Sequence, residues 1–223
     1  VSSAASDVYK RQKLILEHFP NLNKKQIEQF SMLKAIYENW NQKINVISRK
    51  DIDNINLRHV LHSMSIAKFI KFKKQTKILD LGTGGGFPGI PLAILFPDCN
   101  FILVDSIKKK ITVVDNVVKE LKLNNVITFC SRAEKLDLKF DFLVTRAVAK
   151  MPKIINWSRG KFNLESNNEI RNGVIALKGG NVYEELSSIN NPTILPIEEI
   201  IDNQYFIDKK IVYAPVELSN PLA

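Results

Sequence analysis

The sequence predicts an α/β fold in which a helical extension precedes a mostly parallel sheet that ends in an antiparallel hairpin. Three observations support this fold class. Before residue 72, apolar residues recur with helical spacing. From Lys77 onward, short apolar runs alternate with helical segments, which is typical of βαβ units in a parallel sheet. Near the end of the chain, apolar runs follow one another without an intervening helix, as antiparallel strands do.

The extension is expected to contain two amphipathic helices. The first spans residues 23–40, starts at the capping residue Asn23, and places these side chains on one face: Ile27, Phe30, Leu33, Tyr37 and Trp40. The second lies near 56–71 and directs these side chains inward: Leu57, Val60, Leu61, Met64 and Ala67. The pattern changes near 72–76. We therefore expect an extension over 13–76, an α/β domain over 77–215 and a tail over 216–223. Residues 1–12 start without Met and resemble an appended sequence.

The α/β part divides into alternating elements. Strands are expected at 77–81, 100–104, 125–129, 141–145 and 173–177. Helices are expected at 89–96, 106–122, 150–159 and 179–188. At the end of the chain, 193–201 predicts a strand, and 204–208 with 210–214 predict a hairpin with a tight turn at Asp208-Lys209.

Composition limits the class of protein. The chain has 223 residues, enough for a sizeable core, with a formal net charge of +9 and a pI near 9.4. This balance favours a polyanionic partner such as nucleic acid, although an AT-rich genome would also enrich Lys, Asn and Ile. No apolar run approaches the ~20 residues that cross a bilayer, and no signal peptide is recognisable. We expect a cytoplasmic protein.

The cysteines and histidines predict no metal site. Cys99 and Cys130 are isolated, which is typical of a reducing compartment and predicts core positions for both. His18, His59 and His62 form no zinc-binding pattern.

The glycine run at 82–89 is the strongest functional signal, because it holds five of the nine glycines between a strand-like and a helix-like run. Glycine lets the backbone approach a nucleotide closely, and the helix start offers free N–H groups. Residues 84–89 satisfy the dinucleotide pattern G-x-G-x-x-G. A methyltransferase pattern, an acidic residue two positions before G-x-G-x-G, fits these residues: Asp80, Gly82, Gly84 and Gly86. The second template is favoured, because Asp80 can face a cationic methionyl group and Pro88 lacks the N–H that a pyrophosphate would use.

Two later segments fit a nucleoside ligand. Asp105 ends the second strand, where a carboxylate grips ribose hydroxyls, although it could instead cap the next helix. After the third strand, Ser131-Arg132-Ala133-Glu134 could offer backbone N–H groups and a carboxylate to an adenine edge. The alternative is a surface turn in which Glu134 starts a helix.

Cations follow the strands on the substrate side. Arg146 comes directly after the fourth strand, where it could bind a carboxylate or phosphate or form a structural ion pair. Lys178 follows the fifth strand at the same edge. The cluster Lys108–Lys110 suits phosphate contacts near a cofactor site, but such a run is usually just solvated.

The second helix of the extension carries a polar group of residues. Arg58 and His62 share one face, and His59 and Ser63 share another, because these pairs are four residues apart. A buried and satisfied histidine is an equally good interpretation of either ring.

Taken together, these residues resemble the glucose-inhibited division protein B family, the bacterial 16S ribosomal RNA guanine-N7 methyltransferases. The resemblance covers roughly 20–215. It is carried by these motifs: Trp40-Asn41 with Asn45, Arg58-His59 with Ser63, Gly82-Thr83-Gly84 through Phe87-Pro88-Gly89-Ile90-Pro91-Leu92, Asp105-Ser106 with Lys109 and Lys110, Ser131-Arg132 with Glu134, Arg146-Ala147, and Ala176-Leu177-Lys178-Gly179.

The resemblance implies a Rossmann-like class I methyltransferase fold with a seven-stranded sheet. It implies transfer of a methyl group from S-adenosylmethionine to N7 of a guanine in the 530 loop of 16S RNA, with that RNA or the small ribosomal subunit as partner. By the family's pattern, these residues line the cofactor site: Gly82, Phe87, Ala133, Glu134 and Arg146. The family usually has an aspartate where this chain has His62.

Residue chemistry and resemblance together give the expected site. The cofactor contacts are Asp80, Gly82, Gly84, Gly86, Phe87, Asp105, Ala133, Glu134 and Arg146. Candidate RNA contacts are Arg58, Lys108, Lys109, Lys110 and Lys178, and candidate positioning residues are His59, Arg146 and Lys178. No catalytic residue is assigned, because guanine N7 carries no proton and alignment alone can support transfer.

Other functions remain open at this point. The chain could methylate another RNA or another acceptor atom. A nicotinamide-dependent oxidoreductase would bind its cofactor through a pyrophosphate, and a non-catalytic RNA-binding protein would bind RNA without methyl transfer.

Overall fold

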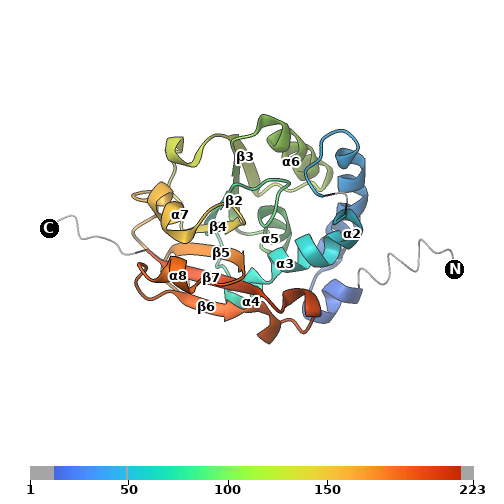
Figure 1. Ribbon diagram of the computed structural model, residues 1–223. Helices are drawn as coiled ribbons and strands as arrows, with labels where there is room; N and C mark the ends of the chain where they lie inside the picture. The colour runs from blue at the N-terminus through green and yellow to red at the C-terminus, as the bar shows by residue number, and fades with distance from the viewer. Residues whose placement is uncertain (1–12, 49, 217–223) are drawn as a thin grey trace.

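The computed structural model describes residues 13–48 and 50–216 (Figure 1). The expectations for 1–12 and 217–223 lie outside the described residues. Within the described part, no helix has the length and apolar character needed to cross a membrane.

A single seven-stranded sheet forms the centre of the molecule, with the strand order β3-β2-β1-β4-β5-β7-β6. The strands are β1 (Lys77–Leu81), β2 (Asn100–Asp105), β3 (Val126–Cys130), β4 (Phe142–Arg146), β5 (Gly173–Gly179), β6 (Thr193–Pro196) and β7 (Lys209–Pro215). Strands β1 to β5 pair in parallel, whereas β7 runs antiparallel to both β5 and β6. The predicted fold class is therefore confirmed.

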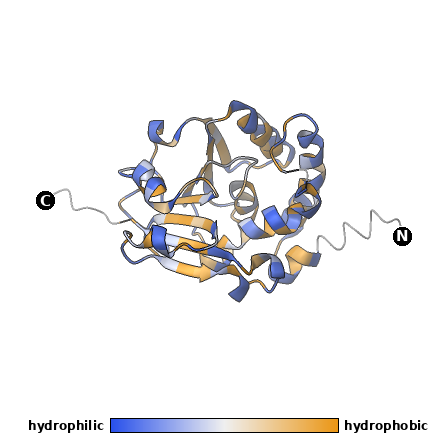
Figure 2. Cartoon of the chain, viewed as in Figure 1, coloured by the Kyte–Doolittle hydropathy of each residue, from blue (hydrophilic) through white to orange (hydrophobic). Residues whose placement is uncertain are grey.

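Helices cover both faces of the sheet, which explains why its central strands are continuous apolar runs. They are α5 (Gly89–Leu95), α6 (Lys108–Glu120), α7 (Met151–Ser158) and α8 (Tyr183–Leu186). One core holds the side chains of α5 and α6 and of the N-terminal helices, and a second core on the other face holds those of α7 and α8. The strands are largely hydrophobic, whereas hydrophilic residues lie on the outer helices (Figure 2).

The N-terminal extension packs against the α/β part as one body. Helix α2 (Lys24–Asn41) starts with a capping box between Asn23 and Gln26. The Gln26 side chain also donates to the carbonyl of Ile94 at 2.9 Å, and Gln29 donates to the carbonyl of Leu121 at 2.8 Å. These bonds satisfy carbonyls at the C-terminal ends of α5 and α6, and they fix α2 on both helices.

The second expected helix is broken into short pieces. A π-helical segment, η2 (Asn56–Leu61), precedes α3 (His62–Met64) and α4 (Ile66–Phe69). The π-helical geometry is rare and often occurs at functional sites.

Several expectations about the C-terminal part were wrong. Residues 204–208 form no strand. They hold the short 3₁₀ helix η5 (Gln204–Phe206), because Asn203 caps the Tyr205 N–H and Phe206 is buried. Strand β6 stops at Pro196, where the helix η4 (Ile197–Glu199) begins, so the hairpin is formed by β6 and β7 with a long connection.

Two further expectations are corrected. Only Tyr183–Leu186 of the expected helix 179–188 is helical, because Gly179 extends β5 and Gly180 turns the chain at φ +72°. Cys99 is buried as expected, but Cys130 is exposed, because it lies on the edge strand β3.

Candidate cofactor and nucleic-acid site

The loop after β1 is built on a buried carboxylate. Oδ2 of Asp80 accepts from the Thr83 hydroxyl at 2.6 Å and from the Gly89 N–H at 2.8 Å. Asp80 is fully buried beneath the loop, and burial raises its pKa to about 7. It does not line the cavity described below, and its Oδ2 supports the loop, whereas its Oδ1 has no hydrogen-bond partner among the described residues.

Glycine is required at two kinds of position in this loop. Gly82, Gly84 and Gly86 have φ of +68°, +59° and +96°, which glycine adopts without strain. A Cβ on Gly89 would lie 2.6 Å from Oδ2 of Asp80, so the close approach of helix and carboxylate excludes a side chain.

The N-terminal extension holds the loop from the other side. The hydroxyl of Tyr37 on α2 donates to the Gly85 carbonyl at 2.5 Å, and its ring lies 5.1 Å from that of Phe87. Asn41, near the end of α2, accepts from the N–H groups of Val46 and Ile47. Val46 thereby reaches the cavity wall. Neither Tyr37 nor Val46 was predicted at the site.

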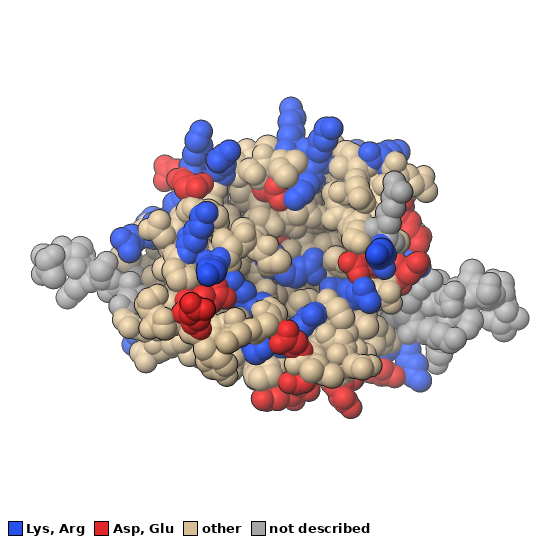
Figure 3. All heavy atoms as spheres, viewed as in Figure 1, with Lys and Arg blue, Asp and Glu red and all other residues tan. Residues whose placement is uncertain are grey.

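A cavity of ≈ 580 Å³ opens at the carboxyl ends of β1, β2 and β4. It is lined by Val46, Leu81, Gly82, Thr83, Gly84, Gly85, Phe87, Val104, Asp105, Ser106, Ile107, Lys110, Ser131, Arg132, Ala133, Glu134, Arg146, Ala147, Val148 and Trp157. This is the edge at which open α/β sheets bind ligands. Figure 3 shows a hollow near the middle of this face, with Lys and Arg side chains around it.

The cavity brings together most of the expected cofactor contacts. These residues line it: Gly82, Gly84, Phe87, Asp105, Ala133, Glu134 and Arg146. Asp80 and Gly86 do not line it.

Asp105 lines the cavity, where the sequence predicts a ribose contact, but it is not the cap of the next helix, because the N-cap residue of α6 is Ile107 and no side chain caps it. Its Oδ1 accepts from the Ile107 N–H at 2.9 Å, next to the start of α6, and its Oδ2 accepts from the Gly84 N–H at 3.0 Å. Nζ of Lys110 lies 3.8 Å from Oδ2. Asp105 is therefore fixed between the glycine loop and α6 while its side chain lines the cavity.

The rest of the cavity lining combines apolar side chains with the carboxylate of Glu134. Ile107 and Val148 are exposed apolar residues on the wall, and Trp157 on α7 joins them. Glu134 lies in the 3₁₀ turn η3 (Ala133–Lys135) after β3. Val148 and Trp157 were not predicted, because nothing in their local sequence separates them from ordinary packing residues.

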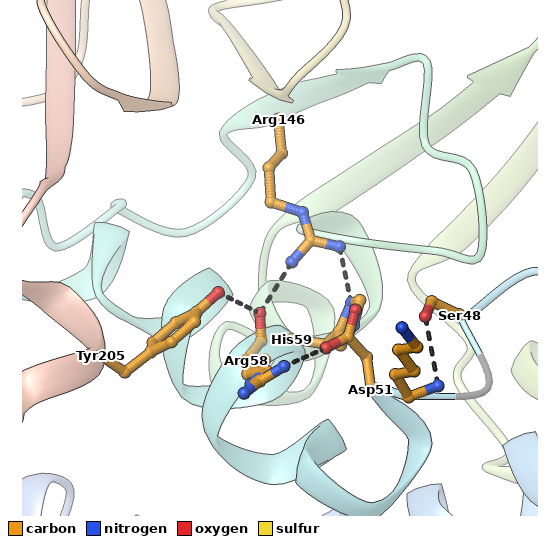
Figure 4. A network of polar contacts seen from close by, with 7 residues as sticks. Ser48, Asp51, Arg58, His59, Arg146 and Tyr205 are labelled. Atoms are coloured by element: carbon orange, nitrogen blue, oxygen red, sulfur yellow. Dashed lines mark hydrogen bonds and ion pairs between the residues drawn. The ribbon is translucent and has the colours of Figure 1, made fainter.

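Arg146 connects the cavity to the N-terminal extension (Figure 4). Its Nη1 donates to the Arg58 carbonyl at 3.1 Å, and its Nη2 lies 2.8 Å from Nδ1 of His59. The guanidinium also lies over the Phe87 ring, 5.4 Å from the centroid. No ion pair joins Arg146 to a carboxylate within the described residues, and burial lowers its pKa. The structural ion pair considered for Arg146 is therefore absent there.

The two histidines of this region are neutral at pH 7. Burial and the neighbouring Arg146 charge lower the pKa of His59 to about 4. The same causes hold the pKa of His62 well below its usual 6.5. Neither ring nitrogen of His62 has a hydrogen-bond partner among the described residues, and the ring packs edge-on against Tyr205 and Phe206.

A basic and aromatic rim borders Arg146, which we define by Arg58, Tyr205 and Lys209. The Tyr205 ring lies 5.8 Å from the Arg58 guanidinium and 4.5 Å from Nζ of Lys209. Its hydroxyl donates to the Arg58 carbonyl at 3.3 Å, and Arg58 pairs with Asp51 at 2.5 Å. Tyr205 and Lys209 were not predicted, since they come from a segment expected to be a hairpin.

The remaining lysine candidates differ in their surroundings. Lys108 and Lys109 are exposed at the start of α6, and only Lys110 reaches the cavity. Nζ of Lys178 donates to the Ala149 carbonyl at 2.6 Å and pairs with Glu185 at 3.2 Å. Lys178 thus ties the segment after β4 to α8, with its charge already paired.

The sheet order, the glycine loop and the carboxylate at the end of β2 define the fold of S-adenosylmethionine-dependent methyltransferases. A SAM-dependent methyltransferase from Aquifex aeolicus matches with a TM-score of 0.52 and 16% identity, over 68% of this chain and 88% of that one. The precorrin-6y C5,15-methyltransferase from Geobacter metallireducens matches with a TM-score of 0.52 and 12% identity, over 78% and 92%. Residues 26–199 match the family model of rRNA small subunit methyltransferase G, and the chain belongs to this family.

Curated relatives align with this chain over almost their whole length. The ribosomal RNA small subunit methyltransferase G of Flavobacterium johnsoniae is 50% identical over 203 residues, which are 91% of this chain and 97% of that protein. The protein of the same name from Porphyromonas gingivalis is 48% identical, over 92% and 93%. The family resemblance found in the sequence is therefore confirmed.

Proposed function

We propose that this protein transfers a methyl group from S-adenosylmethionine to N7 of a guanine in the 530 loop of 16S ribosomal RNA. Family membership supports the reaction class and the RNA. The observation that carries the site is the cavity, whose lining includes the glycine loop, Asp105 and Arg146, and Arg146 in turn bonds to the carbonyl of Arg58 in the basic rim.

The residues of the cavity fit the proposed cofactor. A volume of ≈ 580 Å³ lies within the range of about 300–1,000 Å³ usual for such ligands. The Asp105 carboxylate suits ribose hydroxyls, and Ile107 and Val148 suit the faces of a purine. Glu134 suits the adenine amino group. Arg146 suits the methionyl carboxylate, with which it would form charge-assisted hydrogen bonds.

The chain needs only to align the reactants. Bound S-adenosylmethionine supplies an electrophilic methyl group on a cationic sulfur. Guanine N7 has a lone pair and no proton, so no residue has to act as a base. His59 and His62 stay neutral at pH 7 and add no positive charge near the sulfonium. Phe87 and Tyr37 close the buried end of the site and exclude water there.

The rim formed by Arg58, Tyr205 and Lys209 suits the RNA. An aromatic face between two cations can stack a base while the cations contact phosphates. Lys108 and Lys109 extend the positive surface along the start of α6. Lys178 contributes to this site by holding the segment after β4, because its ammonium group is paired with Glu185.

Transfer assays with methyl-labelled cofactor test the proposal. Small subunits and protein-free 16S RNA, both unmethylated in the 530 loop, are the two substrates, and binding of S-adenosylmethionine and of NAD is measured in parallel. We expect S-adenosylmethionine binding and label in at least one RNA substrate. NAD binding without methyl transfer would favour an oxidoreductase, and RNA binding without transfer would favour a non-catalytic RNA-binding protein.

A further inference from the structure

We infer that His59 determines the specificity for guanine, because it presents an Nε2 proton to O6 of the base whose N7 is methylated. This inference rests on the proposed function and adds a residue that reads the base.

The tautomer of His59 follows from its contact with Arg146. Nη2 of Arg146 lies 2.8 Å from Nδ1 of His59, and a guanidinium can donate but not accept. Nδ1 must therefore be the acceptor and carry no proton. In a neutral imidazole the single proton then resides on Nε2.

The surroundings keep this tautomer in place. His59 is largely buried beside the positive charge of Arg146, and a second proton on Nδ1 would face that charge directly. Arg146 is itself fixed by its second bond, to the Arg58 carbonyl at 3.1 Å. The ring of His59 is also held 5.1 Å from that of Phe87. His59 is thus held in one orientation by Arg146 and Phe87, with Nε2 as its one donor atom; Figure 4 shows the contact with Arg146.

The position of His59 suits contact with the substrate base. Its two packing neighbours, Phe87 and Arg146, both line the cavity at the end assigned to the methionyl group. In the described part of the chain, no residue hydrogen-bonds to Nε2 of His59. Unlike both ring nitrogens of His62, this unpaired nitrogen is not fully buried. His59 itself does not line the cavity, but it packs on two residues that do and directly follows Arg58 of the rim, so its unpartnered Nε2 lies beside both.

A single fixed donor at this position distinguishes guanine from adenine. Guanine presents two acceptors, N7 and O6, on one edge, whereas adenine presents N7 beside an N6 amino donor. With N7 directed at the methyl group, O6 is the neighbouring atom and accepts from Nε2. Adenine would place its N6 amino group against the Nε2 proton. Both groups are donors, so neither would find an acceptor.

Two substitutions of His59 test the Nδ1 contact and the Nε2 contact separately. His59→Asn keeps a carbonyl near the position of Nδ1, where Arg146 can still donate, but has no donor at the position of Nε2. His59→Gln is longer and can place its amide N–H near Nε2. Both variants stay neutral, so charge is not changed.

The test compares two bases at the target position. Small subunits are assembled on ligated 16S RNA that carries either guanine or 2-aminopurine there, since 2-aminopurine keeps N7 and lacks O6. The readout is the ratio of kcat/KM for the two substrates on each enzyme. A partly unfolded variant lowers both rates equally and leaves this ratio unchanged.

We expect the wild type and His59→Gln to prefer guanine by about 3- to 10-fold, the value of one neutral hydrogen bond, and His59→Asn to show no preference. A wild-type preference that persists in His59→Asn overturns the inference, as does a wild type without preference. If the wild type fails to methylate the guanine substrate at all, the proposed function fails first.

Discussion

The contact between Tyr37 and the glycine loop gives the sharpest prediction about how the extension serves the site. Substitution Tyr37→Phe removes one hydroxyl and keeps the ring that packs on Phe87. Tyr37 is fully buried and donates to the Gly85 carbonyl, which is also buried. The variant leaves that carbonyl without its donor, so we expect the free energy of unfolding to fall by about 1–3 kcal/mol.

Cofactor affinity should fall as well, because Gly85 lines the cavity and the loop loses its attachment to α2. If about 1 kcal/mol of loop ordering is lost, Kd for S-adenosylmethionine rises about fivefold. The assays are urea unfolding for stability and calorimetry for the Kd.

Tyr213→Phe is the matched control. The Tyr213 hydroxyl donates to the Arg171 carbonyl at 2.7 Å, and neither residue lines the cavity. This variant should lose stability, by about 0.5–1.5 kcal/mol, and keep the wild-type Kd. Equal Kd values for Tyr37→Phe and Tyr213→Phe would refute the role assigned to the extension.

Three further predictions concern the charged residues. Asp105→Ala should weaken S-adenosylmethionine binding, by about 1.5–3 kcal/mol for each charged hydrogen bond lost, and unchanged affinity by calorimetry would remove Asp105 from the site. RNA binding should weaken with salt by a log–log slope of about −0.7 for each single-strand phosphate neutralised, and replacing Lys108, Lys109 and Lys110 together should flatten that slope; an unchanged slope would exclude them from the RNA surface. Burial raises the pKa of Asp80 from its ordinary 3.8 to about 7, so its contribution to stability is complete below 3.8 and is lost as pH rises through 7. The stability of Asp80→Asn relative to wild type should therefore increase between pH 4 and 7, and a constant difference in urea unfolding would contradict this.

The central strands could be predicted from the sequence because burial on both faces makes each of them a continuous apolar run. Strand β1 was placed at its observed bounds, Lys77–Leu81, for this reason. The segment 204–208 has a comparable apolar content, but its fold depends on the Asn203 cap and on burial of Phe206. Such tertiary contacts leave no periodic signal.

The candidate site was predictable where a residue follows a strand directly. Asp105 and Arg146 were found in this way, and both line the cavity. Tyr37 looked like a core residue of an amphipathic helix, and Tyr205 like part of a strand. Their place beside the loop and the rim depends on how distant segments pack, which the local pattern does not contain.

Asp80 shows a different limit of prediction from the sequence. Its spacing from the glycines marks the motif correctly, but spacing cannot tell a carboxylate that faces the ligand from one that supports the loop. The hydrogen bonds from Thr83 and Gly89 show that Oδ2 of Asp80 supports the loop.

The atom that receives the methyl group can be identified directly. Small subunits unmethylated in the 530 loop are incubated with the protein and S-adenosylmethionine, and their 16S RNA is treated with borohydride and aniline, which cleave the chain at N7-methylguanine. Primer extension then locates the cleavage. The account predicts one new stop, at a guanine of the 530 loop, that requires both the protein and the cofactor. Methyl incorporation without cleavage, or cleavage outside that loop, would contradict it.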